Sequence, residues 1–175
     1  LPVGISSYVE AVSNYYYVDK TLLIRDFVDT LPKVSLFTRP RRFGKTLAIN
    51  TIKTFFEKTQ DDTSRYFTDK NIWLCGEKYR SMQGIYPVVM LTFKDVKFDT
   101  WEESMEAIRL VVKDEYKRHQ ELLTSTVLDA DDKNYIDRME KGTLSGVELQ
   151  RSLLNLTHML SVHHGSKVVI LIYEY

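Results

Sequence analysis

Three short apolar runs divide the chain, and each has the length and composition of a buried β-strand. They cover Val34 to Thr38, Pro87 to Phe93 and Val168 to Ile172, the last of which reads V-V-I-L-I. Continuous β-branched runs are typical of strands that are buried on both faces, as in a parallel sheet covered by helices. The pattern therefore predicts three strands of a parallel sheet.

Longer stretches between these runs carry apolar residues at helical spacing. They cover Thr46 to Lys58, Trp101 to His119 and Leu149 to Leu160, where leucines recur every three or four residues. Strands that alternate with helices favour the α/β class, here a three-layer fold with a parallel sheet between helices, over a helical bundle. No repeat, low-complexity tract or Pro/Gly-rich linker marks a boundary, so residues 1–175 are predicted to form one domain.

Local signals predict where the last helix begins and ends. Ser145 and Glu148 have the S-x-x-E spacing of a capping box, and Gly165 stands where a left-handed C-terminal cap would lie. The acidic segment Asp129 to Lys133 is predicted to be a solvated loop. It lacks the glycine and the spacing of a calcium-binding loop, which argues against a metal site.

The octet Arg39 to Thr46, R-P-R-R-F-G-K-T, separates the first predicted strand from the following helix. A phosphate-binding P-loop has the pattern G-x-x-x-x-G-K-[ST], and here its first glycine is Arg39, followed by Pro40. Pro40 has no N–H to donate and restricts Arg39 to extended geometry, so the loop is expected to turn later than usual. The alternative is a basic surface turn that precedes a helix.

Phosphate binding needs backbone N–H groups that converge near a positive charge, usually at a helix N-terminus. Gly44 would let the backbone approach a phosphate, Lys45 would reach the β- and γ-phosphates, and the Thr46 hydroxyl would bind Mg²⁺. These roles predict a nucleotide site. The remaining backbone donors, and hence the predicted phosphate-binding residues, are Arg41, Arg42, Phe43, Gly44, Lys45 and Thr46.

Hydrolysis requires an acid at the end of another strand, to hold the metal ion and activate water. The run Val168 to Ile172 leads to Tyr173, Glu174 and Tyr175. Glu174 is the candidate catalytic residue, as general base or as the group that positions the attacking water. The alternative is that Glu174 is only a polar residue that ends a buried strand. Tyr173 occupies the place of the metal-holding aspartate, and a phenol is a poor Mg²⁺ ligand.

Several motifs occur together: P-V-G-I-S-S-Y-V-E near the start, Y-Y-Y-V-D-K-T-L-L-I at Tyr15 to Ile24, and L-F-T-R-P-R-R-F-G-K-T at Leu36 to Thr46. In this combination, and over essentially its whole length, the chain resembles the AAA-ATPase-like domain of prokaryotic proteins. The family pattern accommodates Arg39 and Pro40. The resemblance therefore implies a P-loop NTPase fold with ATP and Mg²⁺ as cofactors, bound through the Gly44 end of the octet.

The resemblance also implies what surrounds this segment. In that family a nuclease-like region of the PD-(D/E)XK type commonly follows, and Asp-Glu-Tyr-Asp stands after the last strand where this chain has residues 173–175. We therefore expect a truncated ATPase domain whose later strands are absent from the sequence. A nuclease-like partner domain and assembly into an oligomer are compatible with this expectation.

The segment V-D-K-T precedes the octet in the region where related ATPases contact the adenine or its ribose. Asp19 and Lys20 are accordingly candidate nucleotide-binding residues, and Tyr15 to Tyr17 offer rings that could stack on a base. The alternative for Asp19 is to cap a helix predicted at Thr21 to Val28. The sequence leaves both roles open.

Composition narrows the function classes. The 24 basic and 24 acidic residues cancel, so nucleic-acid binding would need a local patch such as Arg39, Arg41 and Arg42. The single cysteine, Cys75, and the lack of a long apolar segment favour a cytoplasmic protein without a membrane span. The leading hypothesis is ATP binding with hydrolysis that drives motion of an attached domain or partner. The alternatives are a nucleotide-binding module without hydrolysis and a basic loop that binds nucleic acid.

Overall fold

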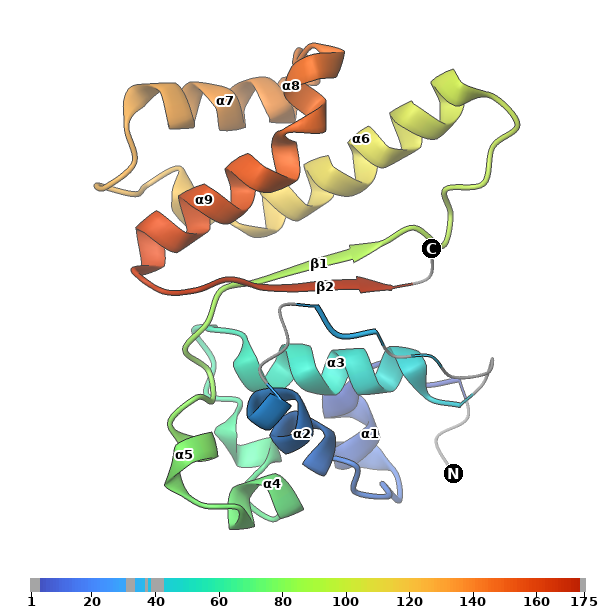
Figure 1. Cartoon of the computed structure of the whole chain (residues 1–175), viewed down its shortest axis with the longest axis vertical. Coiled ribbons are helices and arrows are strands. Elements are labelled where there is room, and N and C mark those ends of the chain that lie inside the picture. Colours follow the sequence, from blue (N-terminus) through green and yellow to red (C-terminus); the bar gives the residue numbers. More distant parts are fainter. Residues whose placement is uncertain (1–3, 31–33, 37, 39–42, 174–175) are drawn as a thin grey trace. The chain divides into compact units, whose positions relative to one another are not determined.

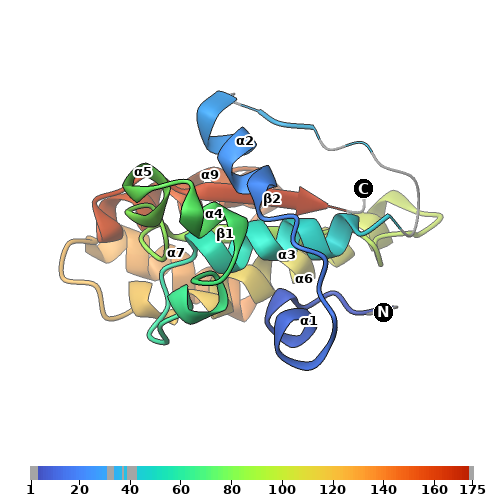
Figure 2. The same cartoon turned by 90° about the horizontal axis from the view of Figure 1, so that it is seen from below.

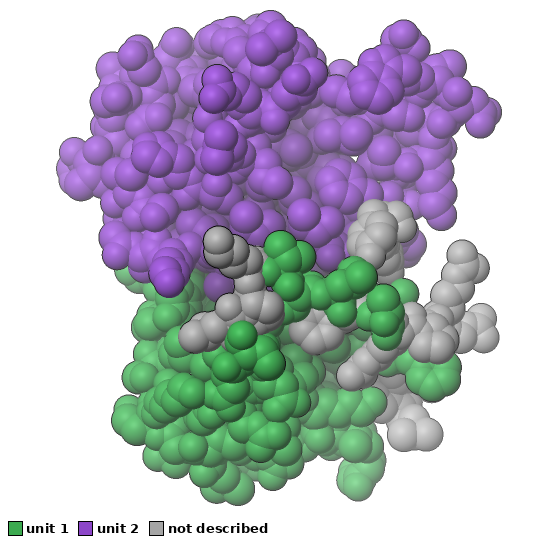
Figure 3. Space-filling view, in the orientation of Figure 1, with its two compact units in different colours: residues 1–86 green, residues 87–175 purple. Residues whose placement is uncertain are grey.

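A computed structural model describes residues 4–30, 34–36, 38 and 43–173. Figure 1 shows its helices and strands, and Figure 3 colours the two compact units into which the chain divides, residues 1–86 and 87–175. Each unit has its own buried side chains and is described separately below. The expectation of one domain over residues 1–175 stays a prediction.

The first unit is built around α3, and Figure 2 shows α1 and α2 on opposite sides of this helix. The Tyr8 backbone N–H donates to Asn50 Oδ1 at 2.6 Å, which ties α1 to α3. The ring of Tyr8 stacks on Phe67 at 4.8 Å, and Phe55 packs edge-on against Phe67. The elements of this unit are α1 (Tyr8–Asn14), α2 (Leu22–Thr30), α3 (Lys45–Phe56), η1 (Ser64–Tyr66), α4 (Asn71–Leu74) and α5 (Glu77–Arg80).

The second unit contains a parallel pair of strands covered by helices. The strands pair in register from Val88 opposite Val169 to Thr92 opposite Tyr173. Their core face packs against apolar residues of the helices that connect them, among them Val112, Leu156 and Leu160. The elements are β1 (Val88–Thr92), α6 (Trp101–Arg118), η2 (Gln120–Leu122), α7 (Ala130–Lys141), α8 (Gly146–Gln150), α9 (Ser152–His164) and β2 (Val169–Tyr173).

Side chains of α6 hydrogen-bond with the backbone of β1. The Met90 N–H donates to Glu115 Oε1 at 2.8 Å, and the Arg118 guanidinium donates to the Val88 carbonyl. Burial alone would raise the pKa of Glu115, but hydrogen bonds from His119 and Arg118 lower it to about 2. The carboxylate is therefore charged at neutral pH, and it takes the place that a neighbouring strand would have on β1.

The structure confirms most of the predicted regular elements. The strands predicted at Pro87 to Phe93 and Val168 to Ile172 are β1 and β2. The predicted helices at Thr46 to Lys58 and Trp101 to His119 are α3 and α6. The helix predicted at Thr21 to Val28 is α2. The chain is thus a mixed helix-and-strand protein with a parallel sheet, consistent with the α/β class.

The strand predicted at Val34 to Thr38 is wrong for the residues of this run that the structure describes. Val34, Ser35, Leu36 and Thr38 pair with no strand, and Val34 and Leu36 are 85% and 69% exposed. A run of apolar residues becomes a strand only when a partner strand accepts its backbone hydrogen bonds. The sheet of the described residues has two strands, so the three-layer P-loop arrangement is not confirmed.

The predicted loop at Asp129 to Lys133 is also wrong. Asp129 is the N-cap of α7, and its Oδ1 accepts the Asp132 N–H at 2.9 Å. The acidic residues that follow it occupy the first turn, where the helix dipole favours negative charge. Ile136 and Met139 are buried, so packing of this apolar face stabilises the helix. The acidic residues at its start had suggested a loop.

The last predicted helix consists of two helices. Its capping box at Ser145 and Glu148 is confirmed, as is Gly165 with φ 62° at the end of α9. The two helices meet at Arg151, which lies between the end of α8 and the start of α9, and the Ser152 hydroxyl donates to the Leu149 carbonyl across this junction at 2.6 Å. A local S-x-x-E signal predicts the start of a helix but carries no information about a break further along.

Candidate functional site

The first site feature is the N-terminus of α3. Gly44 is its N-cap residue, with φ 73° and ψ 26°, a left-handed conformation that glycine adopts without strain. As a glycine, Gly44 provides no side-chain cap, and a Cβ built on it would meet no atom within 4 Å. Lys45 and Thr46 are the first helical residues, with Lys45 exposed. The helix dipole and the N–H groups of the first turn of α3 favour an anion at this end.

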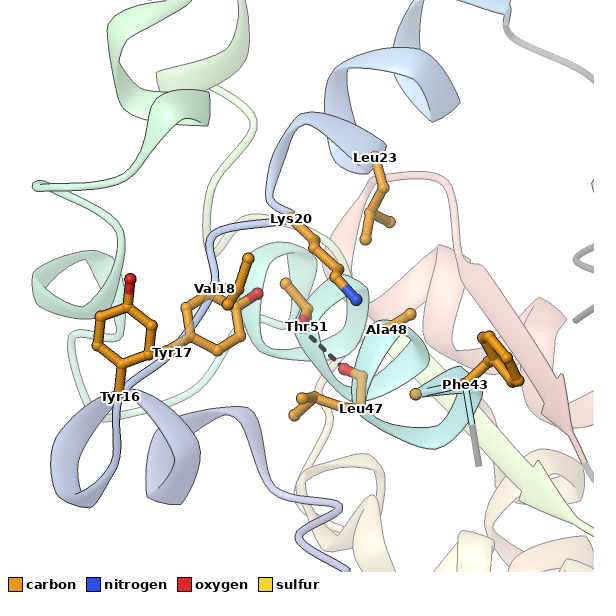
Figure 4. A pocket seen from close by; sticks show the side chains of 10 residues that line it. Tyr16, Tyr17, Val18, Lys20, Leu23, Phe43, Leu47, Ala48 and Thr51 are labelled. Atoms are coloured by element: carbon orange, nitrogen blue, oxygen red, sulfur yellow. Dashed lines mark hydrogen bonds between the residues drawn. The ribbon is translucent and has the colours of Figure 1, made fainter. Parts of the chain in front are cut away.

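A pocket of about 360 Å³ opens beside this helix end, within the first unit (Figure 4). Pockets that hold small molecules begin near this size. One wall is a face of α3, and the facing wall comes from the segment that precedes α2. The residues that line the pocket are Tyr16, Tyr17, Val18, Lys20, Leu23, Phe43, Gly44, Leu47, Ala48 and Thr51.

The wall on α3 follows from helical geometry. Gly44, Leu47, Ala48 and Thr51 are spaced by three or four residues, so they lie on one face of the helix. Seven residues at 1.5 Å each place Gly44 and Thr51 about 10 Å apart along the helix axis. The pocket therefore extends from the helix N-terminus along two turns, which is long enough for a phosphate group at one end and an aromatic group at the other.

Lys20 carries the only charge among the lining residues that the structure describes. Figure 4 shows its side chain extending towards the face of α3 that bears Ala48 and Thr51. Lys20 forms no ion pair with any described residue, so its ammonium is available to a ligand. No carboxylate lines the described walls, and the pocket therefore favours an anionic ligand that also has an apolar or aromatic part.

The aromatic end of the pocket is formed by tyrosines. Burial raises the pKa of Tyr17, although interactions with the Lys20 backbone and the Thr51 side chain act in the other direction. Its phenol therefore stays neutral and presents an apolar ring with one polar tip. Tyr16 is 78% exposed and lies at the rim. Of the tyrosines considered for stacking, the pocket includes Tyr16 and Tyr17.

The V-D-K-T segment turns alternate side chains to opposite sides. Val18 and Lys20 line the pocket. Asp19 Oδ1 accepts the Thr21 N–H at 2.8 Å and its Oδ2 accepts the Asn71 N–H at 2.7 Å. Thr21 is fully buried, and its hydroxyl accepts the Ile72 N–H at 3.1 Å. This alternation is the one expected of extended backbone.

The two candidate nucleotide-binding residues of this segment, Asp19 and Lys20, therefore lie on opposite sides of it. Lys20 lines the pocket, and its contact with a nucleotide stays a prediction. Asp19 is not among the lining residues: its Oδ1 accepts the Thr21 N–H just before α2, and its Oδ2 accepts the Asn71 N–H at the start of α4. A role for Asp19 in direct nucleotide contact stays a prediction.

The structure brings some of the other predicted site residues together. Phe43 and Gly44 line the pocket beside Lys20, and Lys45 and Thr46 follow at the start of α3. The predicted residues Arg41, Arg42 and Glu174 lie outside the described part of the chain. Sequence reasoning missed the apolar lining of α3 and α2. The i, i+3, i+4, i+7 pattern that begins at Gly44 was the available signal, and it leads to Leu47, Ala48 and Thr51.

Within residues 4–30, 34–36, 38 and 43–173, no three His, Cys, Asp or Glu side chains are grouped so that they could hold a metal ion. None of the helices in that same part of the chain has both the length and the apolar character needed to cross a bilayer.

Comparison with known protein families gives a match over nearly the whole chain. The family model AAA-ATPase_like, described as a predicted AAA-ATPase, matches residues 2–175. The resemblance read from the sequence motifs is thereby confirmed. No curated protein and no solved structure matches the chain.

Proposed function

We propose that this chain, which belongs to the AAA-ATPase-like family, binds a nucleoside triphosphate at the N-terminus of α3. The observation that carries the proposal is Gly44 in left-handed conformation at the start of α3, with Lys45 and Thr46 next to it and a pocket alongside. Family membership favours ATP as the nucleotide.

In the proposed complex the phosphates lie against the N–H groups of the first turn of α3. The Lys45 ammonium neutralises the β- and γ-phosphates, and the helix dipole adds to its effect. The nucleoside extends along the pocket towards Tyr17, with Lys20 above it. The lining residues Gly44 to Thr51 span about 10 Å along α3, which leaves room for this direction.

Mg²⁺ is the proposed metal cofactor, with Thr46 as its protein ligand. Mg²⁺ in such sites is held largely by phosphate oxygens and waters, and needs only one or two protein groups. A hydroxyl at the second position of α3 fits that requirement. The metal would neutralise charge that develops on the phosphates, while Gly44 and Lys45 hold the nucleotide in place.

ATP hydrolysis, coupled to motion of an attached domain or a partner, is the activity that we propose for the intact protein. Its support is the family. Glu174 is the proposed general base, and it follows directly on β2. A nuclease-like region, nucleic-acid binding by the arginine-rich octet, an oligomer and a cytoplasmic location remain predictions from the sequence.

A nucleotide-binding module without hydrolysis is the second candidate. Tyr173, the last residue of β2, favours it, because a phenol is a poor ligand for Mg²⁺ where an aspartate is expected. Phosphate release from ATP separates the two candidates. Turnover by this chain that Glu174→Gln removes supports hydrolysis, whereas tight ATP binding without phosphate release supports the binding module.

Calorimetric titration with a non-hydrolysable ATP analogue and Mg²⁺ tests the binding proposal. Lys45→Ala removes a charge-assisted contact, commonly about 2 kcal/mol, so the affinity is expected to fall roughly 30-fold. Lys58→Ala is the matched control, an exposed lysine of the same unit that does not line the pocket. Equal affinity in wild type and Lys45→Ala would contradict the proposal.

A further inference from the structure

We infer that the V-D-K-T segment couples the pocket to helix α4, with Asp19 and Thr21 as positioning residues for ligand binding at Lys20. The inference rests on the proposed nucleotide function and adds a regulatory path to it. Its basis is the alternation of residues 18–21: one side faces the pocket and the other holds the N-terminus of α4. Displacement of either side moves the other, because the segment is only four residues long.

The contacts on the α4 side are specific and long-range. Asn71 and Ile72, the first two residues of α4, donate their N–H groups to Asp19 Oδ2 and Thr21 Oγ1. The N-cap residue Lys70 provides no side-chain cap of its own. A helix of four residues has little stability by itself, since helix nucleation is costly. The N-terminus of α4 therefore depends on two side chains that lie about 50 residues earlier in the chain.

Helices α4 and α5 are linked further to α2, so a change at α4 reaches a larger body. Arg80 Nε donates to the Trp73 carbonyl at 2.7 Å, which joins α5 to α4. Asp29 of α2 accepts Lys78 Nζ at 2.5 Å and the Tyr79 hydroxyl at 2.9 Å. These contacts make α4 and α5 one element that is fixed to α2 at one end and to the V-D-K-T segment at the other.

The coupling follows from linkage between two binding events. A ligand that holds the Lys20 ammonium restricts the backbone of residues 18–21, and thereby favours the Asp19 and Thr21 contacts with α4. By reciprocity, loss of those contacts must weaken ligand binding by the same factor. Nucleotide binding would in this way make α4 and α5 more ordered. A partner that contacts α4 and α5 would then bind differently to the nucleotide-bound and nucleotide-free forms.

Backbone hydrogen exchange on the wild-type chain tests the inference without any substitution. The Asn71 and Ile72 amides are expected to exchange at least about threefold more slowly when a non-hydrolysable ATP analogue and Mg²⁺ are bound. The amide of Ser64, which donates to Asp62 in an exposed turn, serves as the control and should be unchanged. Binding without slower exchange at Asn71 and Ile72 overturns the inference and leaves the proposed function standing. Absence of any nucleotide binding overturns both.

A double-mutant cycle supplies the independent test. Asp19→Asn is expected to lower the affinity for the ATP analogue roughly 5- to 50-fold. Lys20→Met should then lower the affinity much less in the Asp19→Asn variant than it does in wild type. Asp62→Asn is the matched control, because Asp62 also accepts the N–H two residues on but lies outside the pocket. Thr21→Ser should retain affinity that Thr21→Val loses. Full additivity of Asp19→Asn and Lys20→Met contradicts the positioning role.

Discussion

Gly44→Ala isolates the backbone requirement at the start of α3. At φ 73° an L-residue with a Cβ pays a conformational cost of about 1–2 kcal/mol. A Cβ at this position meets no atom within 4 Å, so no steric clash adds to that cost. The structure thus predicts a loss of about 1–2 kcal/mol in the free energy of unfolding, or a fall in Tm of roughly 2–8 °C for a chain of this size.

Urea denaturation of wild type and two alanine variants measures this effect. Gly146→Ala is the matched control: Gly146 is the first residue of α8, its φ is not positive, and a Cβ there also meets no atom within 4 Å. Alanine at Gly146 should be neutral or slightly stabilising, since it reduces the entropy of the unfolded chain. Equal stability of Gly44→Ala and Gly146→Ala would refute the left-handed conformation assigned to Gly44.

Two further predictions concern the second unit. Because the pKa of Glu115 is lowered from 4.5 to about 2, its charge contributes up to about 3 kcal/mol above pH 4.5, and this contribution is lost as the pH falls from 4.5 towards 2. In urea denaturation across that range, the free energy of unfolding should fall less steeply with pH in Glu115→Gln than in wild type. An identical pH dependence of the two proteins would contradict the lowered pKa of Glu115. Ser145→Ala removes the capping box of α8 and should cost about 1 kcal/mol in the same assay. Ser13→Ala, at an exposed helical position, should cost less, and a reversed order would count against the cap.

The features that the sequence predicted well are those that local chemistry determines. Ser145, Glu148 and Gly165 act within a few residues of themselves, so their spacing was sufficient to place the ends of a helix. Gly44 and Lys45 belong to one local motif, and the start of α3 lies at these residues. Lys20, which lines the pocket, was proposed through the resemblance of V-D-K-T to a family pattern, and its nucleotide contact stays a prediction.

The features that the sequence did not predict depend on distant partners. The run that begins at Val34 has strand propensity, yet pairing decides whether it becomes a strand. The Asp19 contact with Asn71 joins residues 52 positions apart, and no spacing rule reveals it. Leu23 and Thr51 line the pocket with apolar or small groups that have no chemical signature in the sequence. Side chains of this kind become site residues only through the fold.

Backbone amide chemical shifts, followed while a non-hydrolysable ATP analogue and Mg²⁺ are added, test the central claim most directly. If the phosphates bind at the N-terminus of α3, the Gly44, Lys45 and Thr46 amides should show the largest changes, with smaller ones at Tyr17 and Lys20. The Lys58 amide, which is bonded to the Tyr86 carbonyl away from the pocket, should stay unchanged. Saturable binding that leaves Gly44, Lys45 and Thr46 unaffected, or no binding at all, would contradict the account.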